Sequence, residues 1–155
     1  EILNSPNWLK YIGDRNVRTL DDAKQYVIDK MNPQFERLGF SNYTVIRKSD
    51  MAKIGSCGLY DREGLEGVDV GFAFLPSYEN KGYGYESASK IKQLAFSKFG
   101  LTKIKAITTK DNIASQKLIK KLGLTFKKFI QISNDSEELM LFEIQKEFYS
   151  KTKTY

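Results

Sequence analysis

The sequence predicts a mixed α/β domain, in which a twisted, mostly antiparallel sheet is flanked by helices. Three observations lead to this fold class. The first 38 residues follow the period of helices, and three short strands then follow one another between residues 43 and 75. A helix next separates strand 68–75 from strand 103–109, and a helical crossover of this kind makes the two strands parallel neighbours.

Length and composition fit one soluble domain that spans residues 1–155. Hydrophobic residues make up 41% and charged residues 28%, and no segment approaches the roughly 20 apolar residues of a membrane span. The first residues lack the pattern of a signal peptide, and the single cysteine, Cys57, excludes an internal disulfide. We therefore expect a cytoplasmic protein without a membrane partner. The net charge of +6 fits nucleic acid, a small polyanionic ligand, or solubility alone.

The chain contains no histidine. This excludes Ser–His–Asp and Cys–His catalysis and the usual zinc catalytic sites, so we expect no metal. Proton transfer would have to use Asp, Glu, Tyr, Lys or water. Cys57 stands in a predicted strand, where we interpret it as a small buried residue and not as a nucleophile.

The N-terminal segment is predicted to be helical. Residues 5–12 place apolar side chains at helical spacing. Thr19 begins the next helix, because the acidic Asp22 three positions later completes a capping box. We expect Pro33 to break this helix before a last short turn at 34–38.

From residue 43 the period changes to that of strands. The predicted strands are 43–47, 53–60, 68–75, 103–109, 124–132 and 138–146. The first three form an antiparallel meander, and Gly55 and Gly58 predict a bulge or a close backbone contact in the second. A turn around residues 133–135 joins the last two strands, and residues 150–155 are expected to be a frayed tail.

Two more helices complete the predicted fold. One runs over residues 83–99 and ends at Gly100. The other begins at a cap formed by Asp111 or Asn112 and ends at Gly123. The apolar residues of these helices are expected to face inward: Ala88, Ile91, Leu94, Ala95 and Phe99 in the first, and Ile113, Leu118, Ile119 and Leu122 in the second.

A glycine-rich turn joins strand 68–75 to the helix that follows it. Gly82 and Gly84 allow a close backbone approach and positive φ angles, and the helix N-terminus adds a partial positive charge. The turn is either a cradle for phosphate or an ordinary strand–helix turn. Its glycine spacing matches neither a dinucleotide fingerprint nor a P-loop. The lysines spread over helix surfaces, which argues against nucleic acid as a partner.

Four segments occur in a defined order: Gly-Val-Asp-Val-Gly-Phe-Ala-Phe-Leu-Pro (67–76), Lys-Gly-Tyr-Gly-Tyr-Glu-Ser (81–87), Thr-Thr-Lys-Asp-Asn-Ile-Ala-Ser (108–115) and Lys-Lys-Leu-Gly-Leu (120–124). Together they resemble the GNAT family of acetyl-CoA-dependent N-acetyltransferases, and most of all its ribosomal-protein N-terminal alanine acetyltransferase branch. Residues 8–19 also look like that branch, so the resemblance covers nearly the whole chain. It implies that the central parallel strands splay apart. The family normally opens with a strand before the first helix, which we expect to be missing here or to lie outside these residues.

The resemblance implies a set of residues that bind acetyl-CoA. Gly82 and Gly84 match the family's phosphate turn, whereas Glu79 departs from the Gln or Arg that usually begins it. Strand residues Phe74 and Leu75 would offer backbone hydrogen bonds to the pantetheine arm. The remaining candidates are Lys81, Tyr83 and Tyr85 in the turn, and Asn112 and Ser115 after the next strand. Asn112 could instead only cap a helix, and Ser115 could only face solvent.

The candidate catalytic residues are Asp69 and Ser115. The branch that this chain resembles often carries Glu at the position of Asp69, and a carboxylate there could take a proton from the attacking amine, directly or through water. Ser115 matches the family position near the thioester sulfur. A strand N–H near Phe74 could stabilise the oxyanion. The alternative for Asp69 is a strand residue that only faces solvent.

The resemblance implies direct attack by a primary amine, either a protein N-terminus or a small amine, without an acetyl-enzyme. A non-catalytic acyl-CoA sensor or partner subunit is the main alternative, and a basic RNA-associated protein is a third. The acceptor depends on residues 5–38 and 61–67, whose Trp8 and Tyr26 either pack in the core or line a substrate pocket. The sequence also leaves a homodimer open.

Overall fold

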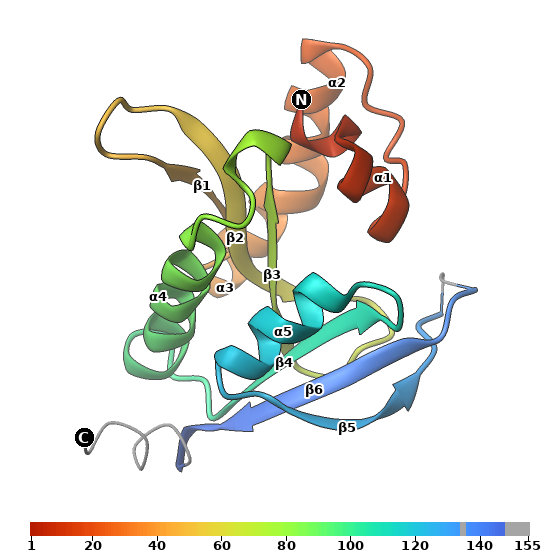
Figure 1. Ribbon diagram of the computed structural model, residues 1–155, viewed down its shortest axis with the longest axis vertical. Coiled ribbons are helices and arrows are strands. Elements are labelled where there is room, and N and C mark those ends of the chain that lie inside the picture. Colours follow the sequence, from red (N-terminus) through yellow and green to blue (C-terminus); the bar gives the residue numbers. More distant parts are fainter. Residues whose placement is uncertain (134–135, 148–155) are drawn as a thin grey trace.

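The computed structural model describes residues 1–133 and 136–147. Its sheet has six strands in the order β1-β2-β3-β4-β6-β5 (Figure 1). The strands are β1 (Asn42–Ile46), β2 (Lys53–Asp61), β3 (Val68–Phe74), β4 (Lys103–Thr109), β5 (Thr125–Ile130) and β6 (Leu139–Gln145). They match the six predicted strands closely. The tail predicted at 150–155 and most of the turn predicted at 133–135 lie outside the described residues.

One pair of strands at the centre of the sheet is parallel, unlike the other pairs. β1, β2 and β3 form the predicted antiparallel meander, and β6 pairs antiparallel with both β4 and β5. β3 and β4 run parallel and pair only through Asp69 and Lys105. Beyond this pair β3 continues to Phe74 and β4 to Thr109, so the two strands diverge toward their C-terminal ends. This confirms the predicted fold class.

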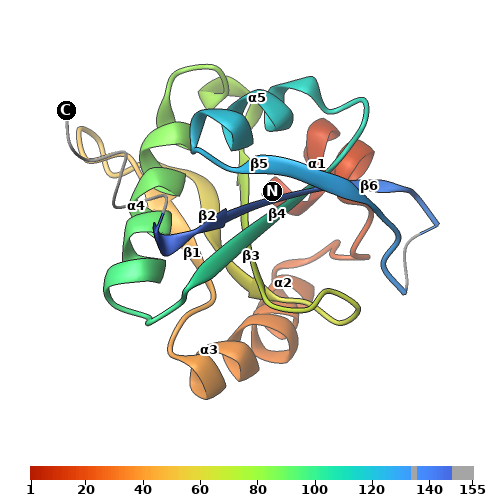
Figure 2. The ribbon, with the colours of Figure 1, turned by 90° about the horizontal axis from the view of Figure 1, so that it is seen from below.

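Helices cover both faces of the sheet (Figures 1 and 2). α4 (Tyr83–Ser97) and α5 (Ile113–Lys121) lie on one face, and α2 (Leu20–Tyr26) and α3 (Asn32–Leu38) lie on the other. α1 (Pro6–Tyr11) lies near the end of the sheet at which β3 and β4 diverge. The short helical turns are η1 (Ile2–Asn4), η2 (Val27–Met31) and η3 (Pro76–Tyr78).

The main hydrophobic core lies between the sheet and helices α4 and α5. Alternate residues of the central strands point into it, among them Leu59 of β2, Val70 of β3 and Phe142 of β6. The residues between them, such as Asp69 and Gly71, therefore point toward the opposite face. This alternation divides the central strands into a core face beneath α4 and α5 and a second face, toward α2 and α3, on which Asp69 and Gly71 line a cavity.

The capping box at Thr19 is confirmed, but the helix break at Pro33 is not. The Thr19 side chain accepts from the Asp22 N–H at 3.1 Å, and the Asp22 carboxylate accepts from the Thr19 N–H at 2.8 Å. Helical structure then continues through η2 into α3. η2 is a π-helical turn, in which the N–H of Asn32 bonds the carbonyl of Val27. Pro33 follows in the first turn of α3, where its missing N–H is not needed.

The inward faces of the last two helices needed small corrections. Ala88, Ile91 and Ala95 are buried as predicted, and Phe96 joins them. Ile113 was expected to point inward but is 53% exposed. It stands five positions before Leu118, which at helical spacing is off the apolar stripe.

Gly58 allows the close approach of β1 to β2. A methyl group at this position would lie 2.4 Å from the carbonyl oxygen of Ser41 and 2.5 Å from Cα of Asn42, and both are backbone atoms that cannot yield without moving the strand. The close backbone contact predicted for this residue is therefore present.

We expect Gly58→Ala to lower the free energy of unfolding by about 1–3 kcal/mol, because the added methyl overpacks the contact between the strands. Thr44→Ala, on the exposed side of β1, is the control and should change it by no more than about 0.5 kcal/mol. Urea unfolding followed by circular dichroism measures both. Equal effects of the two substitutions would contradict the contact.

Candidate active site

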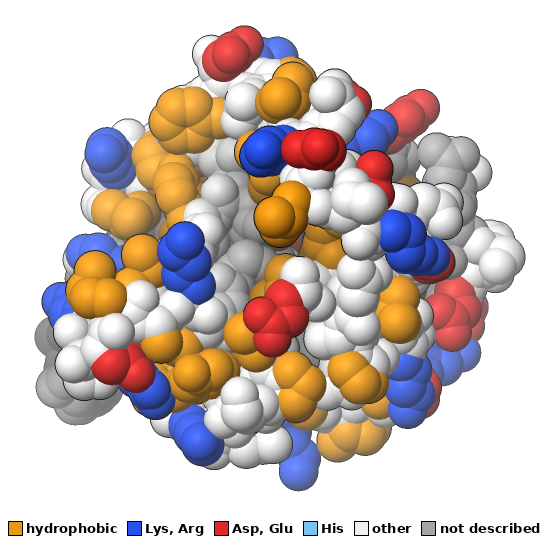
Figure 3. Space-filling view, turned by 90° about the horizontal axis from the view of Figure 1, so that it is seen from above, with side chains coloured by type: hydrophobic (Ala, Val, Ile, Leu, Met, Phe, Trp, Pro, Cys, Tyr) orange, Lys and Arg blue, Asp and Glu red, His pale blue; other side chains and the backbone are white. Residues whose placement is uncertain are grey.

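A cavity of about 1040 Å³ opens where β3 and β4 diverge. On one side it is lined by the turn before α4 and by the first turn of α5. On the other side it is lined by α1, by the end of α2 and by β2. Seen from above, the molecule is hollowed near the middle, with hydrophobic side chains gathered around the hollow (Figure 3). The cavity therefore has two walls, one from each half of the fold.

The edge of β3 that faces the gap carries unpaired backbone. The Leu75 N–H donates to the Ile54 carbonyl at 3.0 Å, toward β2. Because peptide groups alternate along a strand, those of Phe74 and Phe72 point the other way, into the gap. Leu75 was expected to bind a cofactor arm, but its carbonyl also accepts from the Tyr78 N–H at 2.8 Å. Both backbone groups of Leu75 are thus already bonded. The sequence did not suggest Phe72, whose backbone groups point into the gap.

The glycine turn supplies a helix N-terminus without a side-chain cap. Gly82 is the N-cap of α4, with φ 88°, and no side chain within residues 1–133 and 136–147 bonds the first N–H groups of this helix. A methyl group on Gly82 would find no atom within 4 Å, so the turn is open to a ligand there. Gly84 serves packing instead, since a methyl group on it would lie 3.1 Å from Cδ2 of Leu118. The free N–H groups and the helix dipole make this turn suitable for an anion.

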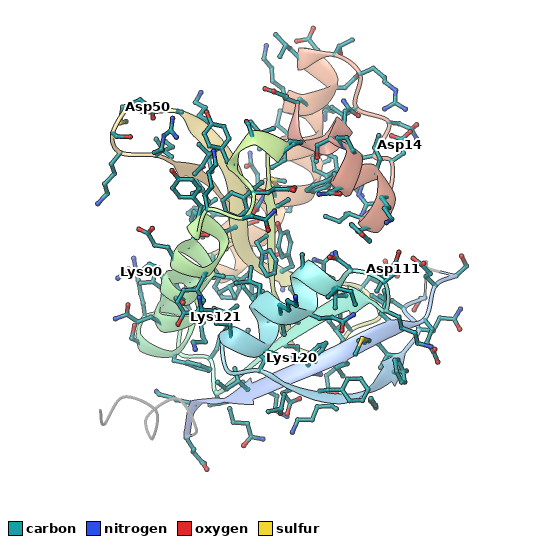
Figure 4. All side chains as sticks on the ribbon, in the orientation of Figure 1. Asp14, Asp50, Lys90, Asp111, Lys120 and Lys121 are labelled. Atoms are coloured by element: carbon teal, nitrogen blue, oxygen red, sulfur yellow. The ribbon has the colours of Figure 1, made fainter. Side chains whose placement is uncertain are left out.

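Cations surround the same turn. The Lys81 ammonium lies 6.0 Å and the Arg47 guanidinium 5.0 Å from the centre of the Tyr78 ring. Lys121 extends from α5 toward α4, and its ammonium lies 4.3 Å from the ring centre of Tyr85 (Figure 4). The Arg47 charge is paired with Asp50, so Lys81 and Lys121 are the cations near the helix N-terminus that favour a polyanion.

Glu79, the irregular residue of the turn, holds α1 in place. Both of its carboxylate oxygens accept from the Asn7 amide, at 2.9 and 3.0 Å. On the other side of the gap, the Lys10 ammonium lies 3.9 Å from the carboxylate of Asp111, which stands between β4 and α5 (Figure 4). α1 therefore bridges the two loops that follow the diverging strands.

Asn112 and Ser115 meet at the start of α5, and both line the cavity. Asn112 is the N-cap, and its amide oxygen accepts from the Ser115 N–H at 3.1 Å. The amide nitrogen of Asn112 bonds no residue in the described part of the chain, so capping leaves it able to donate to a ligand. Ser115 is half-buried, so it is not a residue that only faces solvent.

Asp69 lies at the point where β3 and β4 begin to diverge. It is 1% exposed, lines the cavity and accepts from Nε of Arg62 at 2.7 Å. The Arg62 guanidinium also lies 4.6 Å from the ring centre of Tyr60, the residue opposite Asp69 on β2. Burial raises the pKa of Asp69, and the Arg62 charge opposes this by stabilising the carboxylate. Asp69 is therefore a buried, paired carboxylate and not a solvent-facing strand residue.

Several residues of the second wall could not be assigned from sequence. Trp8 and Tyr26, for which core and pocket were both open, line the cavity together with Tyr60 and Arg62. The π-helical pattern of η2 brings residues four and five positions apart to one side, so Lys30 and Met31 both reach the cavity beside Tyr26. Such turns are frequent at functional sites. The pattern of a regular helix gives no sign of this arrangement.

The chain matches the sequence family described as acetyltransferase (GNAT) domain over residues 1–125. It belongs to the GNAT family. An uncharacterized N-acetyltransferase of Bacillus subtilis, YnaD, is 32% identical to it over 139 residues, which cover 87% of this chain and 78% of that protein. The chain is thus an acetyl-CoA-dependent acyltransferase.

Solved structures with the same fold extend this likeness. The aminoglycoside acetyltransferase AAC(6')-Ib, solved in complex with coenzyme A, superposes with a TM-score of 0.78 at 16% identity and covers 98% of this chain and 90% of its own. A spermidine N-acetyltransferase from Vibrio cholerae, in complex with CoA and spermine, gives 0.76 at 14% identity, covering 96% and 88%. At these identities they show the fold alone.

The resemblance to the ribosomal-protein branch finds less support than the family itself. A ribosomal-protein-S5-alanine acetyltransferase from Vibrio fischeri superposes with a TM-score of 0.66 at 18% identity and covers 83% of this chain and 76% of its own. That is a likeness of fold.

Among the described residues, no helix is long and apolar enough to cross a membrane, and no group of three or more His, Cys, Asp or Glu could hold a metal ion.

Cys57 lies in the core face of β2 and is 1% exposed. Burial raises its pKa to about 12, against a weaker lowering by a hydrogen bond with Ser87. The thiol therefore stays protonated at neutral pH, and a protonated, buried thiol is a poor nucleophile.

We expect Cys57 to resist a thiol reagent such as dithionitrobenzoate in the folded protein at pH 7–8, and to react fully once urea unfolds the chain. Absorbance of the released thionitrobenzoate measures both states. Rapid labelling of the folded protein, with its circular dichroism unchanged, would contradict the buried environment.

Proposed function

We propose that this chain transfers an acetyl group from acetyl-CoA to a primary amine by direct attack within a ternary complex. The observation that carries the proposal is the divergence of β3 and β4 beside the uncapped N-terminus of α4. One groove then offers free helix N–H groups to a pyrophosphate and free strand backbone to the arm that follows it. Both features fit coenzyme A.

The co-substrate is expected to run from the turn into the gap. The N–H groups of Lys81, Gly82, Tyr83, Gly84 and Tyr85 would surround the pyrophosphate, aided by the nearby cations. The backbone of Phe72 and Phe74 would pair with the amides of the pantetheine arm, as a strand would. Asn112 would donate its free amide nitrogen to the arm from the opposite side.

The chemistry needs positioning more than activation, because the thioester is already reactive. The amine attacks the carbonyl carbon, a C–N bond forms, and the C–S bond breaks to release CoA as a thiolate, which takes a proton from water. The Phe74 N–H would stabilise the developing oxyanion. Ser115 would donate a hydrogen bond to the leaving sulfur. The amine proton would pass to Asp69, with a bridging water because the carboxylate is buried.

Arg62 gives Asp69 a defined role in this scheme. Burial raises the pKa of Asp69 and so makes it a stronger base than an exposed aspartate. The ion pair with Arg62 keeps the carboxylate in one orientation, beside the end of the gap where the acetyl group would lie. A protein N-terminus, as in the ribosomal-protein branch, and a small amine are both candidate acceptors.

If CoA binds at the glycine turn, Gly82→Ala should weaken CoA binding. A side chain at a left-handed residue costs roughly 1–2 kcal/mol, which would distort the turn and raise the Kd for CoA about ten-fold. Gly39→Ala is the matched control, because Gly39 is also left-handed, with φ 77° and no neighbour within 4 Å, but lies away from the cavity. Isothermal titration with CoA measures both. Equal Kd values for the two variants would argue against CoA at this turn.

The role of Asp69 as general base is tested by measuring the amine-dependent release of the CoA thiol. We expect Asp69→Asn to lower kcat by about 100- to 10,000-fold, the usual share of a general base. The wild-type rate should fall as the pH drops below the pKa of Asp69, because a protonated carboxyl cannot accept the amine proton, and the variant should lose this dependence.

Cys57→Ala is the control and should keep its activity, since no acetyl-enzyme is expected. Loss of activity in this variant, with its circular dichroism unchanged, would contradict direct attack. CoA binding without thiol release from any amine would favour the alternative of an acyl-CoA sensor.

A further inference from the structure

The wall of the cavity that α4 and α5 form carries a positive charge without a partner. Lys121, the last residue of α5, lines the cavity and forms no ion pair with a carboxylate of residues 1–133 and 136–147. The other cations that line the cavity, Arg15, Lys30 and Arg62, belong to the wall of α1, η2 and β2, and Arg62 is already paired with Asp69. Among the described residues, Lys121 is therefore the one cation that the cofactor side of the cavity presents.

Tyr85 holds this ammonium beside the glycine turn. Lys121 extends from α5 toward α4, and its ammonium lies 4.3 Å from the centre of the Tyr85 ring (Figure 4). Tyr85 stands in the first turn of α4, three residues after Gly82, and it also lines the cavity. A cation is attracted to the face of an aromatic ring, so the contact restricts an otherwise flexible lysine side chain. The charge is thus placed one helical turn from the N-cap of α4.

The glycine turn has charges of opposite sign on its two sides. Toward α1 lies Glu79, whose carboxylate oxygens accept from the neutral amide of Asn7 and are paired with no cation of the described residues. Toward α5 lies Lys121. An anionic group that leaves the turn is repelled by Glu79 and attracted by Lys121. The charges therefore favour the side of α5 for any further phosphate of a ligand bound at this turn.

Coenzyme A carries such a further phosphate. Its pyrophosphate joins the pantetheine arm to an adenosine whose ribose bears a phosphate at the 3' position. With the arm in the gap between β3 and β4 and the pyrophosphate on the N–H groups of the turn, the adenosine has to leave the turn on the other side. The helix N-terminus is then occupied by the pyrophosphate, and Lys121 is left for the 3'-phosphate.

We propose that Lys121 binds the 3'-phosphate of CoA and that Tyr85 positions its ammonium, so that the enzyme distinguishes CoA from 3'-dephospho-CoA. The inference rests on the proposed binding of CoA at the glycine turn. Lys81 is the rival cation, because its ammonium lies 6.0 Å from the centre of the Tyr78 ring, but it does not line the cavity.

The test compares two ligands that differ only in this phosphate. CoA and 3'-dephospho-CoA share the adenine, the pyrophosphate and the pantetheine arm. The measured quantity is the Kd for dephospho-CoA divided by the Kd for CoA, from isothermal titration at one pH and one low salt concentration. A change at the glycine turn or in the gap alters both Kd values alike and cancels from this ratio.

We expect a ratio of roughly ten for the wild type, the lower end for a hydrogen bond between charged groups, because Lys121 is exposed to solvent. Lys121→Met keeps the length of the side chain but removes the charge. It should weaken CoA binding, leave the Kd for dephospho-CoA nearly unchanged and bring the ratio close to one. Lys121→Arg should retain most of the ratio. Lys120→Met, at the exposed neighbouring lysine that does not line the cavity, is the matched control and should leave the ratio unchanged (Figure 4).

The positioning role of Tyr85 has its own variants. Tyr85→Leu removes the ring and should lower the ratio roughly two- to five-fold, the usual share of an exposed cation–π contact. Tyr85→Phe keeps the ring face and should retain more of the ratio than Tyr85→Leu does. Both variants keep the backbone N–H that would face the pyrophosphate, so an effect on the ratio reports on the side chain.

Two results would overturn the subsite: a ratio near one in the wild type, or a ratio in folded Lys121→Met that stays within about two-fold of the wild-type value. Loss of the ratio in Lys81→Met, with Lys121→Met unaffected, would overturn it as well. In each case, weaker CoA binding by Gly82→Ala would still support the turn as the cofactor site. Failure of CoA to bind the wild type at all would instead contradict the proposed function, and the subsite with it.

Discussion

The structure depends on one interruption in its hydrogen bonding. β3 and β4 lie in the middle of the sheet, where strands ordinarily bond along their whole length, yet they pair only through Asp69 and Lys105. Each strand is held by its other neighbour, β3 by β2 and β4 by β6, so the sheet tolerates the gap. The peptide groups left without partners are what a bound arm can satisfy, and the cavity follows from the same divergence.

The narrow end of the gap carries a buried ion pair. Taking Asp69 and Arg62 out of water is costly, and removal of either partner would leave an uncompensated buried charge. The stacking of Arg62 on Tyr60, and the lack of a side chain on Gly71 beneath that ring, leave this pair one arrangement. The same contacts hold the Asp69 carboxylate and the Arg62 guanidinium together at the wall of the cavity.

α1 joins the two halves across the opening. Its Asn7 bonds Glu79 beside the phosphate turn, and its Lys10 lies near Asp111 before α5. Glu79 interrupts the family's usual pattern at this position, and its contact with Asn7 gives a structural reason for an acidic residue. Because α1, which carries Trp8, is tied to the turn before α4 and to the loop before α5, the same contacts hold both walls of the cavity.

The sequence alone determined the strands, the main helices and the glycine turn, because these depend on local spacing: alternation in β2 and β3, helical period in α4, and positive φ at Gly82. The resemblance to the GNAT family also singled out Asp69, Asn112 and Ser115, all of which line the cavity. Tertiary structure decided the rest. Asp69 is paired with Arg62, which directly follows the neighbouring strand β2. The peptide groups of Leu75 bond Ile54 and Tyr78, and a π-helical turn lets helical structure continue into α3, which contains Pro33. The ion pair and the Ile54 contact depend on how neighbouring strands pair, and the π-helical turn is a rare helical geometry, so the periodicity of a single segment encodes none of them.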